Sequence, residues 1–248
     1  MQKEQISATG IVLSQIPIGD YDKRITILTK ELGKINAFVR GAKRPNSPYA
    51  AVSDPFAFGE FMLYPGKNAY NLAKVNMTEY FEALHQDLEA IWYGSYFLEL
   101  ADYYGRENVD ASEQLNLIYI SLKALCDERF SNRLVRAVYE CKTLAVNGEQ
   151  PDFYSCVQCK KKEKLRWFLS RRNGCMCSQC ATERPAGAVL VEESALYAMQ
   201  YVVNAPIGKI FTFRLSDDAL LQFEEVMRDY YAKWVDRKFK TLKFLEDI

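Results

Sequence analysis

Apolar side chains recur at every second position through much of the first 80 residues, the period of a strand with one buried face. Ile25 and Ile27 alternate with polar neighbours, and the same pattern continues through 35–39. Comparable stretches occupy 5–18 and 56–81, the second around a Pro-Gly-Lys-Asn turn. Five short strands with little helical signal predict a small β-barrel over residues 1–80.

From about residue 83 the apolar period lengthens toward that of an α-helix. Helices are predicted to begin at Ser112 and Ser216, which are suitable N-cap residues, and one is predicted to end at Asn147 and Gly148. Residues 81–248 are therefore expected to form a helical domain, with a cysteine-rich insertion at 150–184. The fold class predicted is α+β and multidomain.

Charge is balanced overall but unevenly distributed along the chain. The formal net charge is zero, yet residues 1–80 carry a net +3 and residues 151–184 a net +5, whereas the two segments that follow them are acidic. Alternating basic and acidic segments allow a polyanion to be held on one face. The chain has no apolar run of about 20 residues and no signal-peptide core, so we expect no membrane partner and a cytoplasmic location, where thiols stay reduced.

Five of the seven cysteines lie between residues 156 and 180. Cys156 and Cys159 form one C-x2-C pair, and Cys177 and Cys180 form a second pair after a 17-residue spacer. This spacing is typical of a four-thiolate zinc site. The spacer contains an Asn-Gly turn, which favours a hairpin that returns the second pair to the first.

The predicted zinc ion is structural, because four thiolates fill a tetrahedral shell and leave no position for a substrate or water. His85, the only histidine, is distant in sequence and is expected to be a surface or capping residue. Cys175 is interpreted as a small apolar filler, with a ligand exchange or redox role as the alternative. Cys126 and Cys141 occupy apolar helical positions and are expected in the core.

The segment between the cysteine pairs carries seven Lys and Arg residues against one acid, Glu163. Neutralising a zinc–thiolate centre needs about two of them, so a polyanion or an acidic partner is plausible there. Phosphate-binding loops, dinucleotide fingerprints and serine or zinc hydrolase motifs are missing from the sequence. Catalysis is therefore weakly supported, and we expect no enzymatic activity.

Small five-stranded barrels often bind single-stranded nucleic acid through cations and aromatic rings. Phe38, Phe58 and Phe61 lie within strands and are expected in the core. The candidate DNA-binding residues occur at the start of the second strand, in the loop after the third strand and in the turn between the last two strands. They are Lys23, Arg24, Arg40, Lys43, Arg44 and Lys67.

Taken together, these segments resemble the RecO recombination-mediator family. The resemblance is carried by GIVLSQIPIGDYDKRITILTKELGKINAFVRGAKRPNS at 10–47, DPFAFGEFMLY at 54–64, NRLVRAVYECKTLAVNGEQPDFYSCVQC at 132–159 and NGCMCSQC at 173–180. The C-terminal DRKFKTLKFLEDI also fits. One departure is Pro48, where many members of the family carry a further basic residue.

The resemblance implies an N-terminal OB-fold barrel, a helical domain and an inserted zinc module. It implies binding to single- and double-stranded DNA, annealing of complementary strands coated by single-strand-binding protein (SSB), and loading of RecA together with RecR, without nucleotide hydrolysis. The expected location is the nucleoid. By resemblance, Lys23, Arg24, Arg40, Lys43 and Arg44 map onto the family's basic barrel positions, and Cys156, Cys159, Cys177 and Cys180 onto its zinc ligands. Two alternatives remain open: a protein scaffold with a structural zinc, and a zinc-dependent nuclease.

Overall fold

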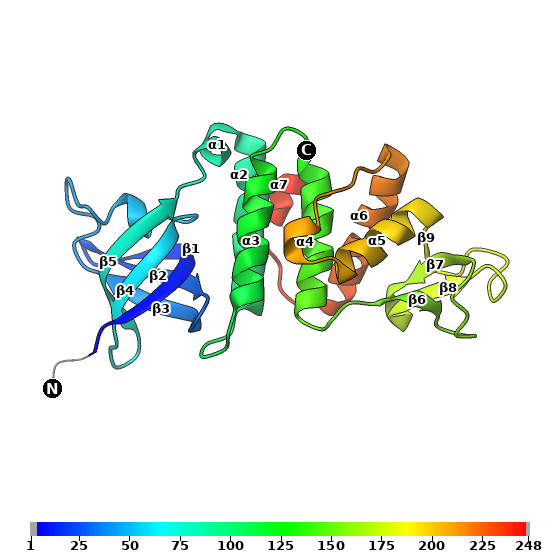
Figure 1. Ribbon diagram of the computed structural model, residues 1–248, viewed down its shortest axis with the longest axis horizontal. Coiled ribbons are helices and arrows are strands. Elements are labelled where there is room, and N and C mark those ends of the chain that lie inside the picture. Colours follow the sequence, from blue (N-terminus) through cyan, green and yellow to red (C-terminus); the bar gives the residue numbers. More distant parts are fainter. Residues whose placement is uncertain (1–3, 247–248) are drawn as a thin grey trace. The chain divides into compact units, whose positions relative to one another are not determined.

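The computed structural model describes residues 4–246 of the chain (Figure 1). The chain divides into two compact units, which are described in turn. The first unit comprises residues 1–126 together with 239–248, and the second comprises residues 127–238. The C-terminal segment therefore belongs with the N-terminal half of the chain.

The first unit begins with a closed five-stranded barrel, which confirms the predicted barrel. Its strands are β1 (Ile6–Ile18), β2 (Asp22–Thr29), β3 (Gly33–Val39), β4 (Phe58–Tyr64) and β5 (Tyr70–Glu79). The strands follow the order β1-β2-β3-β5-β4, and β4 pairs with β1 to close the barrel. Only β3 and β5 pair in parallel, while the other four pairings are antiparallel. This is the topology of an OB-like barrel.

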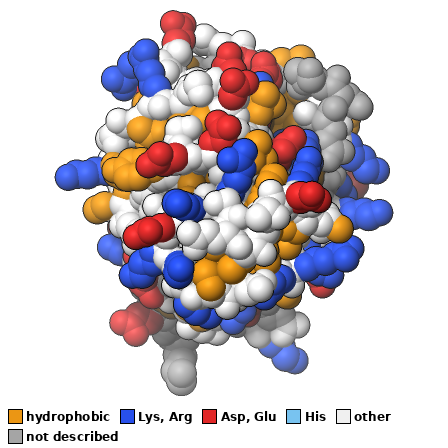
Figure 2. All heavy atoms as spheres, turned by 90° about the vertical axis from the view of Figure 1, so that its right-hand side faces the viewer, with side chains coloured by type: hydrophobic (Ala, Val, Ile, Leu, Met, Phe, Trp, Pro, Cys, Tyr) orange, Lys and Arg blue, Asp and Glu red, His pale blue; other side chains and the backbone are white. Residues whose placement is uncertain are grey.

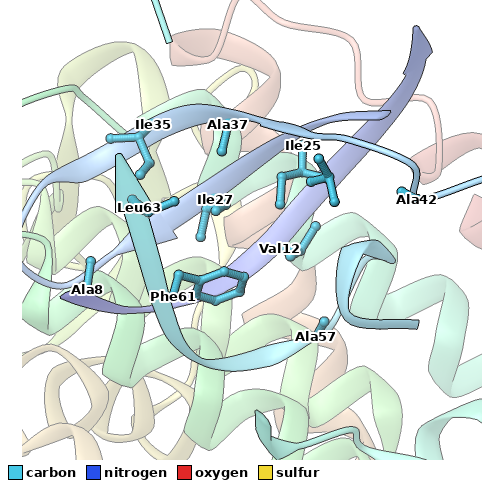
Figure 3. Close-up of a cluster of buried hydrophobic side chains, with 11 residues drawn as sticks. Ala8, Val12, Ile25, Ile27, Ile35, Ala37, Ala42, Ala57, Phe61 and Leu63 are labelled. Atoms are coloured by element: carbon cyan, nitrogen blue, oxygen red, sulfur yellow. The ribbon is translucent and has the colours of Figure 1, made fainter. Parts of the chain in front are cut away.

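Alternating apolar residues fill the barrel interior (Figure 3). Ile25 and Ile27 from β2 meet Ile35 from β3 and Phe61 from β4, and each of these side chains is buried. Because successive residues of a strand point to opposite sides, the intervening positions of β2 and β3 face outward. Phe61 is in the core as predicted, but Phe38 and Phe58 are not part of this cluster.

Helices complete the first unit. They are α1 (Glu82–Gln86), α2 (Leu88–Tyr104), α3 (Ser112–Leu125) and α7 (Leu242–Glu246). The Asp87 carboxylate caps α2 by accepting from the backbone N–H groups of Glu89 and Ala90. The predicted cap at Ser112 is wrong: Ser112 is the first helical residue, and its hydroxyl donates to Asp110.

The second unit contains three longer helices and a small sheet. The helices are α4 (Asn132–Val146), α5 (Glu193–Asn204) and α6 (Asp217–Trp234), and they pack against one another. The predicted cap at Ser216 is confirmed, since its hydroxyl accepts from the N–H of Ala219 at 3.4 Å. The predicted end of α4 is also confirmed, with Asn147 as the C-cap and Gly148 in the left-handed conformation that follows many helices.

The small sheet carries the cysteine-rich segment. Its strands are β6 (Asp152–Cys156), β7 (Leu165–Leu169), β8 (Gly174–Cys177) and β9 (Val189–Leu190), in the order β6-β8-β7-β9. β7 and β8 form the predicted hairpin, and β6 pairs with β8 in parallel. We refer to residues 150–184 as the cysteine module.

Helix α6 holds the cysteine module through polar contacts of two aromatic side chains, the buried Tyr230 and the half-exposed Trp234. The Tyr230 hydroxyl donates to the carbonyl of Glu149 at 2.6 Å and lies 2.8 Å from Asn173 Oδ1. The Trp234 indole N–H donates to the Ser170 carbonyl at 3.1 Å. These bonds fix the turn of the β7–β8 hairpin on the helices of its own unit. None of the helices in residues 4–246 combines the length and the apolar character needed to cross a membrane.

Candidate metal centre and nucleic-acid interface

The four cysteines of the two C-x2-C pairs converge in the structure. Cys156 ends β6 and Cys177 ends β8, and each is followed by a turn that carries the second cysteine of its pair. All four Sγ atoms lie within 4.8 Å of one another. Such a cluster can bind one metal ion.

The geometry of the sulfurs fits tetrahedral coordination. Cys159 Sγ lies 3.7 Å from Cys177 Sγ. A metal–sulfur distance of about 2.3 Å gives a tetrahedron whose edge is about 3.8 Å. Backbone N–H groups of Gln158 and Cys177 approach Cys156 Sγ at 3.4 Å, as expected for stabilising a thiolate ligand.

The protonation of the cluster is consistent with a need for a cation. Burial acts to raise the pKa of Cys156, but backbone hydrogen bonds from Cys159, Cys177 and Gln158 lower it to about 6. The pKa of Cys180 is raised to about 12, chiefly by its hydrogen bond with Cys159. Adjacent thiolates repel one another, so Cys180 keeps its proton beside the ionised Cys156 unless a metal ion neutralises their charge.

The other cysteines lie apart from this group. Cys175 is buried on β8, and its burial raises the pKa of the thiol to about 12, as expected for an apolar filler. Cys141 is buried in α4, which confirms its predicted core position. Cys126 was also expected in the core, but it is only partly buried because it is the C-cap of α3.

The outward face of β2 and β3 brings two cations beside an aromatic ring. Arg24 lies opposite Phe38 in the antiparallel ladder, and Arg40 follows directly after Val39, the last residue of β3. Both arginines are exposed, and Phe38 is half-buried. Strands 2 and 3 form the usual nucleic-acid-binding face of an OB-fold. We call Arg24, Phe38 and Arg40, together with the loop 41–44, the barrel face.

The loop after β3 adds two more cations to the barrel face. The N–H of Gly41 donates to Asp22 Oδ1 at 2.8 Å, and the N–H of Lys43 donates to the Tyr21 carbonyl at 2.9 Å. The guanidinium of Arg44 lies 5.4 Å from the centroid of the Tyr21 ring. The Lys43 ammonium also donates to the Gly19 carbonyl at 3.2 Å, so these contacts hold the loop against the β1–β2 turn and the start of β2.

Lys67 lies further along the barrel. It lines a hollow of about 320 Å³ that also includes Asn36 and Tyr70. Asn36 precedes Arg40 by four residues, the last of which lies just beyond β3, so the span is at most about 13 Å at 3.3 Å per residue. Lys67 is therefore separated from the other cations, but it lies where the outward face of β3 continues toward the β4–β5 turn.

Lys23 has a different environment from its neighbour Arg24. Its Nζ lies 2.8 Å from Asp54 Oδ1, and the Lys23 side chain is only 14% exposed. Consecutive residues of a strand face opposite sides, so Lys23 lies on the side of the inward-facing Ile25 while Arg24 faces outward. The Lys23 ammonium is thus engaged within the barrel.

Sequence reasoning assigned Phe38 to the core and overlooked Asn36 and Tyr21. The alternation contained the missing signal, because Ile35, Ala37 and Val39 are all buried and the residues between them must face the other side. Tyr21 is exposed in the β1–β2 turn. Only the docking of the loop 41–44 shows that its ring belongs beside Arg44.

These features define a class of multidomain proteins that combine an OB-like barrel, a helical region and a four-cysteine module suited to a metal ion. Residues 1–81 match the family model described as "Recombination protein O N terminal", and residues 85–243 match "Recombination protein O C terminal". Together the two matches cover nearly the whole chain.

Full-length relatives agree with these matches. The chain is 29% identical over 244 residues to a protein named DNA repair protein RecO from Acetivibrio thermocellus, covering 98% of this chain and 97% of the relative. It is 31% identical over 245 residues to the protein of that name from Alkaliphilus metalliredigens, covering 98% and 99%. A Bacillus subtilis relative with the same name is 29% identical over 240 residues, with 96% and 93% covered. The chain belongs to the RecO family of DNA repair proteins.

Proposed function

We propose that this protein is a recombination mediator that binds single- and double-stranded DNA and anneals complementary strands coated with SSB. With RecR, it would help to load RecA, and it would act on the nucleoid without hydrolysing nucleotide. The relatives are named for DNA repair, which supports a role on DNA. The observation that carries the proposal is the barrel face, where Arg24 lies opposite Phe38 beside three further cations.

The chemistry of the barrel face suits a single strand. Arginine and lysine neutralise phosphates and release condensed counterions, which makes the affinity depend on salt. An aromatic ring at the surface offers a base a stacking partner irrespective of its identity. Phe38 and Tyr21 provide such rings next to Arg24 and Arg44. Sequence-independent binding of this kind is what an annealing protein needs, since it must hold any pair of complementary strands.

The metal we propose for the cysteine module is zinc, in a structural role. Tetrahedral thiolate donors are the usual ligands of zinc, and the sulfur spacing agrees with that geometry. When bound, zinc would cross-link the ends of β6 and β8 with their turns. Because four thiolates fill the coordination shell, this donor set supports a structural metal rather than a nuclease centre.

Strand annealing tests the proposed function. Complementary oligonucleotides precoated with SSB should anneal faster when the purified protein is present, and a variant with Arg24, Arg40, Lys43 and Arg44 changed to Ala should lose most of this effect. A control changes two exposed cations elsewhere on the barrel, Lys30 and Lys74, to Ala, and it is compared with the double change of Arg24 and Arg40, which removes the same number of charges. If the protein neither binds oligonucleotides at low salt nor accelerates annealing, a scaffold role replaces the proposal.

A further inference from the structure

A groove lies in the second unit between the cysteine module and helix α5. Its volume is about 730 Å³, within the range of about 300–1,000 Å³ that is usual for ligand clefts. One wall is formed by the segment 162–166 with Ser178, and the other by residues 191–193 and the exposed side of α5. Neither the barrel face nor the metal ligands contribute to it.

The two walls carry opposite charges. Lys162, Lys164 and Arg166 are exposed on the module side, and within residues 4–246 no carboxylate forms an ion pair with any of them. Glu192 and Glu193 are exposed on the helix side and likewise have no ion pair in the described chain. The module wall also contains one acid, Glu163, so the groove separates a wall of net positive charge from a wall that carries two anions. Figure 2 views this side of the molecule, where Lys and Arg side chains are interspersed with Asp and Glu around exposed apolar groups.

An aromatic ring projects beside an apolar floor. Leu165, Val191 and Leu196 are buried at the base of the groove, whereas the Tyr197 side chain is 67% exposed. Glu193, Tyr197 and Gln200 are spaced by four and three residues, so they share one face of α5. A large exposed ring without an intramolecular partner is a candidate stacking surface.

The cysteine pairs position the basic wall. The N–H of Cys156 donates to the Lys161 carbonyl at 2.8 Å, and the N–H of Ser178 donates to the Lys164 carbonyl at 2.9 Å. Lys160 and Lys164 have φ angles of 62° and 54°, in the left-handed region that non-glycine residues seldom occupy. Such conformations persist where the surrounding structure enforces them, and here the turns of the two C-x2-C pairs do so.

We infer that this groove is a second single-strand-binding surface, which is distinct from the barrel face and is shaped by the cysteine module. The phosphates of the strand lie along Lys162, Lys164 and Arg166, a base stacks on Tyr197, and base amino groups donate to Glu192 and Glu193. Carboxylates accept hydrogen bonds from the exocyclic amine of cytosine in this manner. The inference rests on the proposed function and adds a separate site for nucleic acid.

The opposed charges favour a single strand over a duplex. A single strand has phosphates on one side and base edges on the other, which matches one basic and one acidic wall. A duplex carries phosphates on both outer edges, so its second backbone would meet Glu192 and Glu193 and be repelled. An acidic peptide has no base edges to donate to the glutamates, so it matches only half of the groove.

Fluorescence anisotropy with labelled oligo-dC, whose bases carry the exocyclic amine, across a series of salt concentrations tests the inference on the full chain. Changing Lys162, Lys164 and Arg166 to Ala should weaken binding about tenfold and reduce the slope of log K against log salt by about 2, since each single-strand phosphate contact contributes about 0.7. The matched control changes Lys209, Arg214 and Lys233 to Ala. These residues are exposed in the same unit and outside the groove, and the slope should not move.

Three further variants separate the roles of the walls. Tyr197→Ala should lower single-strand affinity several-fold, and a 5-bromouracil oligonucleotide should photocross-link to Tyr197 in the wild type. The double variant Glu192→Gln, Glu193→Gln should raise the affinity for duplex DNA several-fold. The ratio of single-strand affinity to duplex affinity should fall accordingly. Cys159→Ser should weaken single-strand binding like the triple change and increase hydrogen exchange in residues 160–166.

The outcomes distinguish the inference from the proposed function. If the wild type binds no DNA at low salt, the proposed function itself fails. If the wild type binds and the barrel variant is weakened, but the groove variant equals its control, only the second surface is excluded. If labelled poly-glutamate binds more tightly than oligo-dC and loses binding in the groove variant, the groove docks an acidic protein segment and the inference is overturned.

Discussion

Arg24 on β2 and Phe38 on β3 are directly cross-strand neighbours on the outer surface of the barrel. Side chains paired in this way lie about 5 Å apart at their Cβ atoms, so one nucleotide can contact both. We expect Phe38→Ala to lower the affinity for labelled oligo-dT about tenfold through loss of stacking, with little change in salt slope. Arg24→Ala should instead reduce the slope by about 0.7.

Lys74→Ala provides the control for this pair, because Lys74 is an exposed cation on β5 rather than on β2 or β3. Phe38→Tyr keeps the ring and should restore most of the affinity. Equal losses of DNA affinity in Arg24→Ala and Lys74→Ala would show that binding depends on the total charge of the protein and not on the barrel face.

The neighbours Lys23 and Arg24 should separate stability from binding. Lys23 Nζ contacts Asp54 Oδ1 at 2.8 Å, and Asp54 also accepts from the Gln15 amide. Because Asp54 is half exposed, solvent screens the pair, and we expect Lys23→Met to cost about 0.5–1 kcal/mol. Urea unfolding measures this change, while the salt slope of DNA binding should stay as in the wild type.

Arg24→Met is the matched control, since it removes the adjacent cation from the opposite side of the strand. It should lower the salt slope and change the free energy of unfolding by less than about 0.5 kcal/mol. A reversed result, with Lys23→Met lowering the slope, would mean that the Asp54 pair opens to release Lys23 toward DNA.

Periodicity predicted the barrel and the helices because those elements bury one continuous face. The alternation around Ile25 and Ile27 and the helical repeats of 132–148 both report such burial directly. The cysteine module was predictable for another reason. Four thiolates on one ion require short C-x2-C spacings and a hairpin to join them, and both features are local in sequence.

The remaining features depend on contacts that local sequence does not encode. β6 pairs in parallel with β8, and β9 has only two residues, so neither carries a periodic signal. The Lys23–Asp54 pair joins residues 31 positions apart. The groove beside α5 arises only when the basic segment 162–166 folds against that helix, which no pattern within either segment predicts.

The contact between β5 and α3 should make stability depend on acid pH. Glu79 accepts from Lys123 Nζ at 2.9 Å and from the N–H of Phe81, and the hydrogen bond with Lys123 is the main cause that lowers the pKa of Glu79 below its ordinary 4.5. A carboxyl group with a depressed folded-state pKa stabilises the fold above its unfolded pKa. That contribution disappears as the pH falls through the folded-state value.

Glu79→Gln should therefore lower the free energy of unfolding by about 0.5–1 kcal/mol at pH 7, and the difference from the wild type should shrink below pH 4.5. Urea titrations from pH 7 to pH 3.5 follow this change. Glu82→Gln is the control, because Glu82 is an exposed residue of α1 without such an ion pair. If the difference in free energy of unfolding between Glu79→Gln and the wild type is unchanged at pH 3.5, poor packing of the glutamine amide, and not loss of the carboxylate charge, causes it.

Cys159 and Cys175 should respond in opposite ways to replacement by serine. Cys159 Sγ lies 3.7 Å from Cys177 Sγ within the four-sulfur cluster, so Cys159→Ser removes one of the four proposed ligands and, if the proposed zinc is bound, should reduce the zinc content to well below one ion per chain. The segment between the cysteine pairs then loses its cross-link, and the thermal midpoint of the second unit should fall.

Cys175 is buried outside the cluster, so Cys175→Ser should keep one zinc ion per chain while costing about 1–2 kcal/mol for a buried hydroxyl. Metal analysis by inductively coupled plasma mass spectrometry, paired with urea unfolding, measures both effects. Loss of zinc from Cys175→Ser with full retention in Cys159→Ser would contradict the proposed ligand set.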